Sequence, residues 1–462
     1  MQLPVAFLAA WIGVLPPWGP GSAAESAAKA SLAESATALA APEPPGTPCA
    51  SSEGIDYGPR LARWIEKRKA KCGQLAPYRP RFLERQILAF EKAERPAITQ
   101  FNVFGFYPRA QTIEHRSQLA GGARFWRPEI VGTRFDASGS AFWSLQGFRF
   151  YDLQLGVVPH AGKAFPLFAI KSDDVFELAN VRQDSETRYM LYGSFAYRWA
   201  PEFDFFGIGP DSRAEDRADF LLEDKVYEVV AGCRVLPRLT LSVRAGRYHA
   251  EIGPGRDAEL PPIEQVFAAS AVPGLATQPD FVRTGAAAVF DSRDVMENPH
   301  RGAVIAVQWL RHDGRGTSPA GFDRLGVDAR GFLPLGHPQR LLALRAYASQ
   351  DAPRAGGRVP FYMQSFLGSS HTLRGYLSQR FRGERLALFQ AEYRWEAAPA
   401  LELAAFFESG AVAATRHDAL EGFRTDGGVG LRFKTHEAAQ LRLDCVWGAE
   451  GFRFLFRLGP VY

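Results

Sequence analysis

Hydrophobic and polar residues alternate one by one along most of the chain after residue 115. Between residues 385 and 396, for example, Ala387, Phe389 and Trp395 share one parity, whereas Gln390 and Glu392 share the other. Successive side chains of a β-strand point to opposite faces, so an alternation with a period of two predicts strands. We therefore expect an all-β fold from about residue 115 to the carboxyl terminus.

The pattern predicts sixteen antiparallel strands, an even number. The long connections fall at residues 251–280, 351–384 and 411–422, and short turns separate most of the others. Long loops at one rim, short turns at the other, an apolar outer face and a charged inner face are typical of an outer-membrane β-barrel. Closure of the sheet would also remove its exposed edges. The predicted strands are 117–128, 130–143, 145–157, 166–180, 187–200, 217–235, 238–250, 281–290, 302–313, 321–333, 340–350, 385–396, 401–410, 423–434, 438–448 and 451–461.

The residues before the predicted barrel show other patterns than strand alternation. Residues 1–24 have a short apolar core followed by small residues, which predicts a secretory signal peptide that is too short to span a bilayer as a helix. Residues 25–57 are rich in Ala, Ser, Pro and Gly and predict a disordered linker. Residues 58–114 predict a short helical periplasmic segment, and residues 115–462 the transmembrane barrel.

Composition and charge exclude several classes of protein. The formal net charge of +4 is small and the basic residues are scattered, so no nucleic-acid partner is expected. The four cysteines show no CxxC spacing, so we expect no metal and no cofactor. Cys49 and Cys72 flank the first helical stretch, and their spacing leaves open whether they pair. Cys233 and Cys445 lie on the apolar parity of their strands, which predicts that both face lipid.

Motifs of common enzymes are missing from the sequence. There is no P-loop and no GxSxG, and His436 lacks the second histidine that a zinc-protease helix needs. Ser369, Ser370 and His371 are the nearest candidate for a Ser–His pair, but they lie in a long loop. We expect that the protein is not an enzyme.

The last predicted strand has an aromatic face and a weak end. Phe452, Phe454 and Phe456 share one parity with the terminal Tyr462. Gly459 weakens a strand and Pro460 cannot donate a ladder hydrogen bond. The sequence therefore predicts a weak seam where the last strand meets the first strand near residue 117.

Three motifs resemble one family. The stretches LGSSHTLRGY (367–376), FRGERLALFQAEYRW (381–395) and AAFFESGAVA (404–413) are similar to the signature region of the BamA/TamA-type outer-membrane assembly factors, the bacterial surface antigen family. The stretches FDSRDVMENPHRG (290–302) and FFGIGPDSR (205–213) add to the resemblance, which covers about residues 115–462. It implies a sixteen-stranded barrel with loop 351–384 inserted into its own lumen, and a seam that can open laterally.

The resemblance also implies roles for single residues. Leu373, Arg374, Gly375 and Tyr376 match the motif at the tip of the family's loop. In the family the loop arginine pairs with acidic residues of the following strands, and here Glu392 and Glu408 fall on the lumenal parity. An arginine that forks onto carboxylates suits a latch, although both carboxylates could instead simply line a wet lumen. FFESG has Glu408 where family members often have Asp.

The resemblance implies insertion or translocation of proteins at the bacterial outer membrane. The expected partners are outer-membrane lipid and unfolded outer-membrane protein clients or a periplasmic partner, with the barrel itself monomeric. Family members that act on proteins normally carry periplasmic POTRA domains. Only about 90 residues separate signal and barrel here, and they lack strand pairs. A passive pore or structural barrel is the alternative, and a lipid-modifying barrel enzyme is the third.

Overall fold

The computed structural model describes residues 105–127, 130, 135–158, 178, 188–295, 298–315, 321–337, 339–354, 357–398, 401–434 and 439–458. All of them belong to the second of the chain's two units, Arg81–Tyr462. The signal peptide, the linker, the helical stretch at 58–93, Cys49 and Cys72 lie outside the described residues. Within the described part, no helix has the length and hydropathy needed to cross a bilayer.

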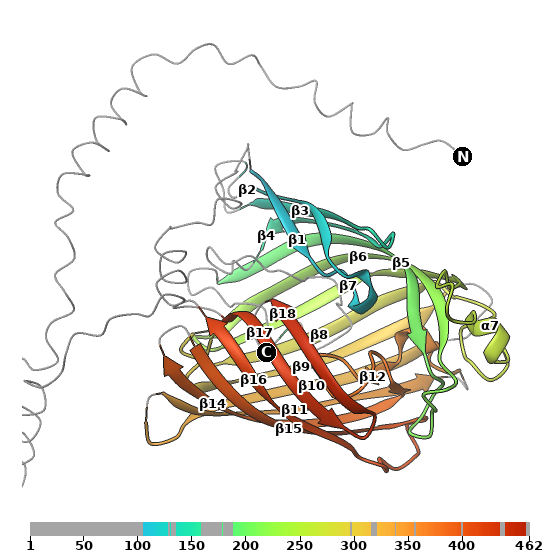
Figure 1. Ribbon diagram of the computed structural model, residues 1–462. Coiled ribbons are helices and arrows are strands. Elements are labelled where there is room, and N and C mark those ends of the chain that lie inside the picture. Colours follow the sequence, from blue (N-terminus) through green and yellow to red (C-terminus); the bar gives the residue numbers. More distant parts are fainter. Residues whose placement is uncertain are drawn as a thin grey trace, which may run out of the picture. The chain divides into compact units, whose positions relative to one another are not determined.

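Sixteen antiparallel strands form one continuous sheet in chain order (Figure 1). They are β1 (Phe106–Gln111), β2 (Ala120–Arg127), β3 (Asp136–Ser144), β4 (Arg149–Val157), β5 (Tyr189–Phe205), β6 (Ala218–Leu236), β7 (Leu239–Pro254), β8 (Phe281–Asp291), β9 (Gly302–Gly314), β10 (Gly321–Pro334), β11 (Arg340–Arg354), β14 (Arg385–Ala398), β15 (Leu401–Ala413), β16 (Arg424–Lys434), β17 (Ala439–Gly448) and β18 (Gly451–Leu458). Short elements in the connections are η1 (His115–Ser117), α7 (Ile263–Val266), η2 (Phe361–Met363), β12 (Ser365–Leu367) and β13 (Phe381–Gly383). The predicted all-β, sixteen-stranded fold is confirmed.

One predicted strand is wrong and one was missed. Residue pairs from Arg149↔Trp199 to Val157↔Leu191 join β4 directly to β5, so no strand lies between these two in the sheet. Residues 166–180 lie outside the described residues except for residue 178. The count is restored by β1, which lies inside the segment predicted to be helical and periplasmic. β1 is only six residues long and contains Pro108, so its alternation was too brief to recognise. The first strand of the seam is therefore 106–111 and does not lie near residue 117.

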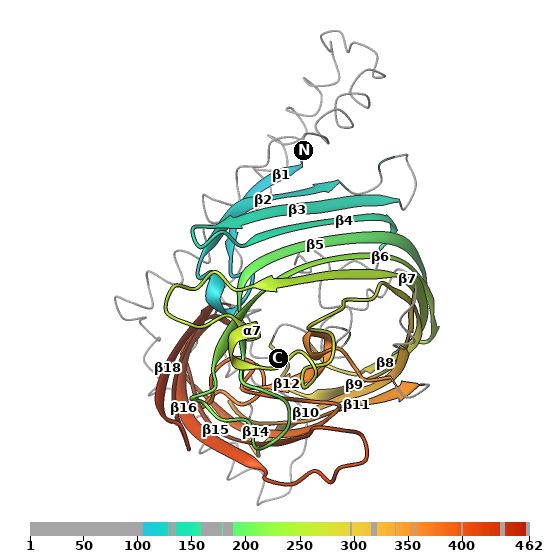
Figure 2. The same ribbon diagram turned by 90° about the vertical axis from the view of Figure 1, so that its right-hand side faces the viewer.

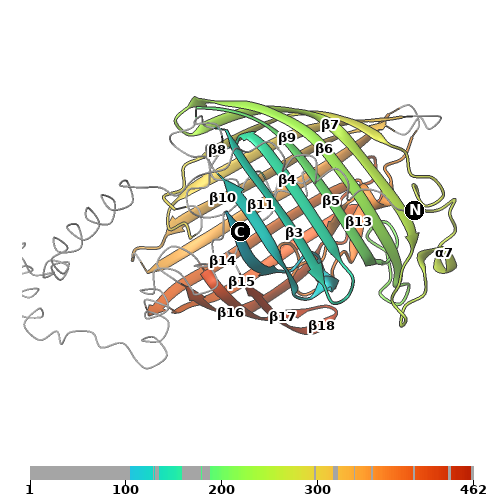
Figure 3. The ribbon, with the colours of Figure 1, turned by 90° about the horizontal axis from the view of Figure 1, so that it is seen from above.

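The sheet curls around a lumen, as Figures 2 and 3 show from two directions. The connections 206–217, 255–280 and 414–423 and the described residues 357–384 are long and emerge at one rim, whereas residues 237–238 form a tight turn at the other. Long loops mark the extracellular rim of such barrels. β18 runs away from that rim, so Leu458 lies at the opposite rim of the sheet.

The two faces of the sheet differ in the way that the alternation predicts. Phe389, Tyr393 and Trp395 of β14 are exposed on the outer face, whereas Gln390 and Glu392 are buried on the inner face. Charged residues are numerous on the inner side. The six largest fully buried side chains among the described residues are arginines, namely Arg283, Arg330, Arg345, Arg432 and Arg442 of the strands and Arg374 of the long loop. A soluble sandwich would bury aromatic residues in these places. The predicted apolar-out orientation is confirmed.

The two largest of the four apolar clusters of described residues include residues of the connections as well as of the wall. One lies toward the extracellular rim and packs Phe205, Phe220 and Phe361 together with α7 residue Ile263. The other includes Val304, Tyr347 and Leu388 from the wall with Leu373 and Tyr376 from the long loop. Apolar packing inside the barrel therefore supports the loop, while charged residues fill the space between.

The outer face leads to a prediction about the two described cysteines. Cys233 pairs across the sheet with Tyr189 and Leu241, and Cys445 pairs with Val429 and Phe454. In a Cys49→Ser/Cys72→Ser background, a membrane-soluble maleimide should label both cysteines and a charged maleimide should label neither. Leu145→Cys, in a turn where Leu145 is 98% exposed, is the control that the charged reagent should reach. Efficient labelling of Cys233 or Cys445 by the charged reagent would reverse the assignment of faces.

Candidate functional site: the lumenal loop and its arginine

The connection from β11 to β14 folds back into the lumen. Its two short strands, β12 and β13, pair with each other from Ser365↔Gly383 to Leu367↔Phe381, and β12 is visible inside the curve of the sheet in Figure 2. At Gly383 a Cβ atom would lie 2.1 Å from the Ala413 carbonyl oxygen, so only glycine allows this approach to the wall. The predicted insertion of loop 351–384 is therefore seen for its described residues, 357–384.

Arg374 lies at the tip of this loop and is 2% exposed. Its backbone N–H donates to Glu408 Oε2 at 2.8 Å, and its Nε donates to Glu408 Oε1 at 2.8 Å. Its Nη1 and Nη2 both lie 3.4 Å from Glu392 Oε2. The structure thus brings together the three residues of the predicted latch (Arg374, Glu392 and Glu408).

Two further groups complete the surroundings of the Arg374 guanidinium. Its Nη1 donates to Asp444 Oδ2 at 3.2 Å, and its Cζ atom lies 3.4 Å from the centroid of the Phe406 ring. Charged and aromatic partners together occupy the edge and one face of the planar group. Sequence reasoning missed both residues, although each follows the parity expected for the inner face of its strand.

The neighbouring motif residues hold the backbone of the tip. Gly375 N–H donates to Asp426 Oδ2 at 2.7 Å, and a Cβ atom on Gly375 would lie 2.7 Å from the Cβ of Asp426. The Tyr376 hydroxyl donates to the Thr425 carbonyl oxygen at 3.3 Å. Burial raises the pKa of this hydroxyl, so it stays a neutral donor at physiological pH. Leu373 is fully buried in the apolar cluster.

The carboxylates of the latch are shared with arginines of the wall. Glu392 accepts from Arg394 Nε at 2.6 Å and from Arg432 Nη2 at 2.6 Å. Asp444 accepts from Arg442 Nε at 2.8 Å. Glu392 and Asp444 therefore each contact Arg374 and at least one arginine of the wall, which offsets the cost of burying these carboxylates.

Glu408 suits its position because its two oxygens serve different donors. One accepts from the Arg374 backbone and the other from its Nε, while Gln390 Nε2 also donates to Oε1 at 2.5 Å. The departure from aspartate in FFESG therefore preserves the contact with the loop arginine. An aspartate would have one methylene less with which to span both donors.

The loop also contacts the end of the sheet that includes the last strand. His371 Nε2 lies 2.9 Å from Arg457 Nη2 of β18, and Arg380 Nε donates to Glu450 Oε1 at 2.5 Å in the turn before β18. The loop thus links the wall at β14 to the last strand. The predicted seam residues Gly459, Pro460 and Tyr462 lie outside the described residues.

The contacts of Arg374 predict a large effect of its removal. Leaving buried carboxylates without their cation costs about 3–5 kcal/mol in a dry site. Arg374→Ala should expose the loop to protease and lower the temperature at which the folded band on a cold-SDS gel is lost. Arg374→Lys should restore little, because an ammonium group cannot replace a planar fork.

One control variant and one double variant show whether the effect is specific to the contact between Arg374 and Glu408. Arg385→Ala removes an arginine at the extracellular rim that donates only to the Asp418 carbonyl oxygen and should leave both readouts unchanged. The double variant Arg374→Ala/Glu408→Gln should lose less thermal stability than the sum of the losses in the two single variants, because the two side chains contact each other. An Arg374→Ala protein that resists protease and melts like the parent would show that the latch does not hold the loop.

Comparisons with known proteins agree with this architecture. Residues 264–460, which include the loop and every strand that contacts Arg374, match the model of the Omp85 superfamily domain. BamA from Haemophilus ducreyi lacking POTRA domains 1-3 is similar in structure, with a TM-score of 0.53 at 12% identity over 81% of this chain and 77% of that one.

Other solved structures are more distant. CdiB from Escherichia coli gives a TM-score of 0.48 at 11% identity over 77% of this chain, and CdiB from Acinetobacter baumannii gives 0.43 at 11% identity over 74%. The chain spans 62% and 54% of these two chains, less than two thirds of each. A search of curated proteins gave no match. Residues 264–460 therefore carry an Omp85 superfamily domain, and the chain is an outer-membrane β-barrel protein.

Proposed function

We propose that this barrel takes part in the insertion or translocation of proteins at the bacterial outer membrane. The observation that carries the proposal is the position of the superfamily domain. Its residues 264–460 contain the whole lumenal loop, Arg374 and the carboxylates that hold it. The part of the chain that resembles assembly factors is therefore also the part with the most specific buried network.

The edges of the sheet support the same proposal. Among the described residues, no ladder pair joins β1 to β18. β1 has six residues and β18 has eight, whereas β5, β6 and β7 have 17, 19 and 16. A strand needs about 9–11 residues to cross the hydrocarbon layer, so both edge strands of the sheet are shorter than a full crossing. Edge strands also offer backbone donors and acceptors to an incoming strand.

The filling of the lumen favours this role over a passive pore. Arg345 donates to Asp328, to Gln390 and to the His371 carbonyl oxygen, which ties the loop tip to β10, β11 and β14. The partners we propose are outer-membrane lipid and unfolded barrel clients, or a periplasmic protein that delivers them.

The enzyme alternative finds little support in the loop. The Ser369 hydroxyl bonds to the Thr372 hydroxyl at 3.0 Å and accepts from the His371 backbone N–H at 3.1 Å. The His371 ring contacts Arg457. These contacts shape the turn before Arg374, and we therefore propose that the protein does not act as an enzyme.

Depletion of the protein tests the proposal directly. If it assembles other barrels, their abundance in the outer membrane should fall at least twofold while outer-membrane lipoproteins stay unchanged, as quantitative proteomics would measure. Arg374→Ala should fail to restore them and Arg385→Ala should succeed. Unchanged levels of every other barrel, together with large stable conductance of the purified protein in planar bilayers, would instead favour the pore.

A further inference from the structure

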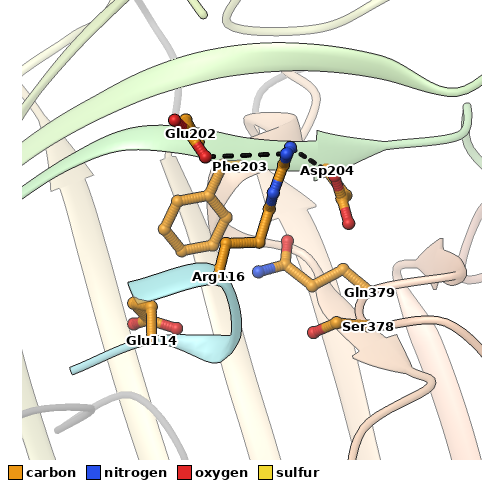
Figure 4. A pocket seen from close by; sticks show the side chains of 7 residues that line it. All are labelled: Glu114, Arg116, Glu202, Phe203, Asp204, Ser378 and Gln379. Carbon is orange, nitrogen blue, oxygen red and sulfur yellow. Dashed lines mark hydrogen bonds and ion pairs between the residues drawn. The ribbon is translucent and has the colours of Figure 1, made fainter. Parts of the chain in front are cut away.

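A half-buried arginine, Arg116, lies in the turn between the first two strands. The turn contains η1, at the extracellular end of β1 and β2, and Arg116 extends from it among acidic residues of other segments (Figure 4). Arg116 Nη1 lies 3.1 Å from Asp204 Oδ1 and 3.7 Å from Asp219 Oδ1. Its Nη2 lies 3.5 Å from Glu202 Oε2 and also contacts Asp257 Oδ2.

Hydrogen bonds of Ser117 hold the backbone of the turn that carries Arg116. The Ser117 hydroxyl accepts from the Ile113 N–H at 2.9 Å and from the Glu114 N–H at 3.1 Å. It also donates to the Glu114 carbonyl oxygen at 2.8 Å. The turn that carries Arg116 is thus held by its own hydrogen bonds, so less entropy is lost when its side chain binds.

The carboxylates that face Arg116 are also held by hydrogen bonds. Asp219 is fully buried and accepts from the backbone N–H of Phe203 and of Asp257, both at 2.9 Å. Asp204 accepts from Arg217 Nη2 at 3.0 Å. The carboxylates come from β5, β6 and the β7–β8 connection, so one arginine joins the first turn to three other parts of the barrel.

The cluster depends on the charge of Arg116. Its four carboxylates, on Glu202, Asp204, Asp219 and Asp257, are opposed by only two arginines, Arg116 and Arg217. Burial by itself would lower the pKa of Arg116, but the hydrogen bond to Asp257 and the nearby carboxylates outweigh it and raise that pKa. Loss of Arg116 would leave like charges crowded together, which would favour separation of the segments.

The turn that carries Arg116 follows the edge strand β1. β1 is an edge strand with six residue pairs to β2, from Phe106↔Phe125 to Gln111↔Ala120. Next to Arg116, Glu114 accepts from Arg198 Nη1 of β5 at 2.5 Å. Ser378 and Gln379 of the lumenal loop line the same small cavity, so the first turn and the loop meet there (Figure 4).

We propose that Arg116 is a positioning residue that clamps the β1–β2 hairpin to the wall and thereby limits opening of the seam between β1 and β18. The part of the proposal that concerns clients rests on the proposed function. The clamp itself is a property of the isolated barrel. It acts at the opposite side of the seam from the contacts that the loop makes with β18.

Hydrogen exchange of the full chain in lipid nanodiscs tests the clamp without any client. Arg116→Ala should raise the exchange rates of backbone amides in residues 106–127 at least tenfold and leave the rates in residues 302–354 unchanged. Arg116→Lys should fall between, because it keeps the charge and loses the fork. Arg213→Ala removes an arginine that pairs with Glu215 at 3.4 Å at the surface of the β5–β6 connection and should have no effect.

If Arg116→Ala does not fold, a milder variant can be measured in its place. Asp257→Asn removes one acceptor and should raise exchange in the same residues at least threefold. Parent-like exchange in every folded variant at these positions, or an increase spread evenly over the sheet, overturns the clamp.

A second assay separates the clamp from the proposed function. The probe is an eight-stranded outer-membrane barrel, supplied unfolded in urea to proteoliposomes. If the parent does not accelerate its insertion, the proposed function fails while the exchange result still decides the clamp. If the parent accelerates insertion, Arg116→Ala should change that rate at least threefold. An unchanged rate despite faster local exchange would overturn the link between clamp and seam.

Discussion

Pairing of buried arginines with carboxylates is the constraint on which the rest of this barrel depends. An outer face that contacts lipid must be apolar, so the polar residues of every strand are directed inward. Charges removed from water are tolerated only where opposite charges and hydrogen bonds replace the lost hydration. The inner wall meets this requirement with partners on neighbouring strands, as Asp328 does for Arg330 and Arg345. The lumen is thus held by directional contacts rather than by a conventional apolar core.

The lumenal loop follows from the same constraint. A connection of this length loses considerable entropy when it is fixed, and specific anchors must offset that loss. Arg374 supplies one anchor by joining Glu392, Glu408 and Asp444, which lie on three different strands. The apolar cluster around Leu373 and Tyr376 supplies the other. Since removal of one charge leaves several partners uncompensated, the loop is expected to be held or released as a unit.

The two arginine sites occupy complementary positions in the sheet. Arg374 and its neighbours in the loop bind strands near the carboxyl terminus, including β18 through His371 and Arg457. Arg116 binds the turn of the first hairpin to β5, β6 and the β7–β8 connection. The two ends of the sheet are therefore each restrained by a charged cluster, and Gln379 brings the loop close to the second cluster. An opening between β1 and β18 would need to weaken one of them.

The sequence by itself determined the fold class and the orientation of the two faces, because alternation is a local property that each strand carries alone. The predicted count of sixteen strands was correct only because one missed strand and one wrongly predicted strand cancelled. The resemblance of the sequence to a family also selected Arg374, Glu392 and Glu408, which the structure brings together. The sequence did not determine which strands form the first part of the sheet, where β1 is short and β4 pairs directly with β5. It also could not select Asp444, Asp426, Phe406 or the partners of Arg116 from the many polar and aromatic residues with the same parity. Those choices depend on the register between strands and on the path of two connections through space, and only the tertiary structure decides which carboxylates come within reach of each guanidinium.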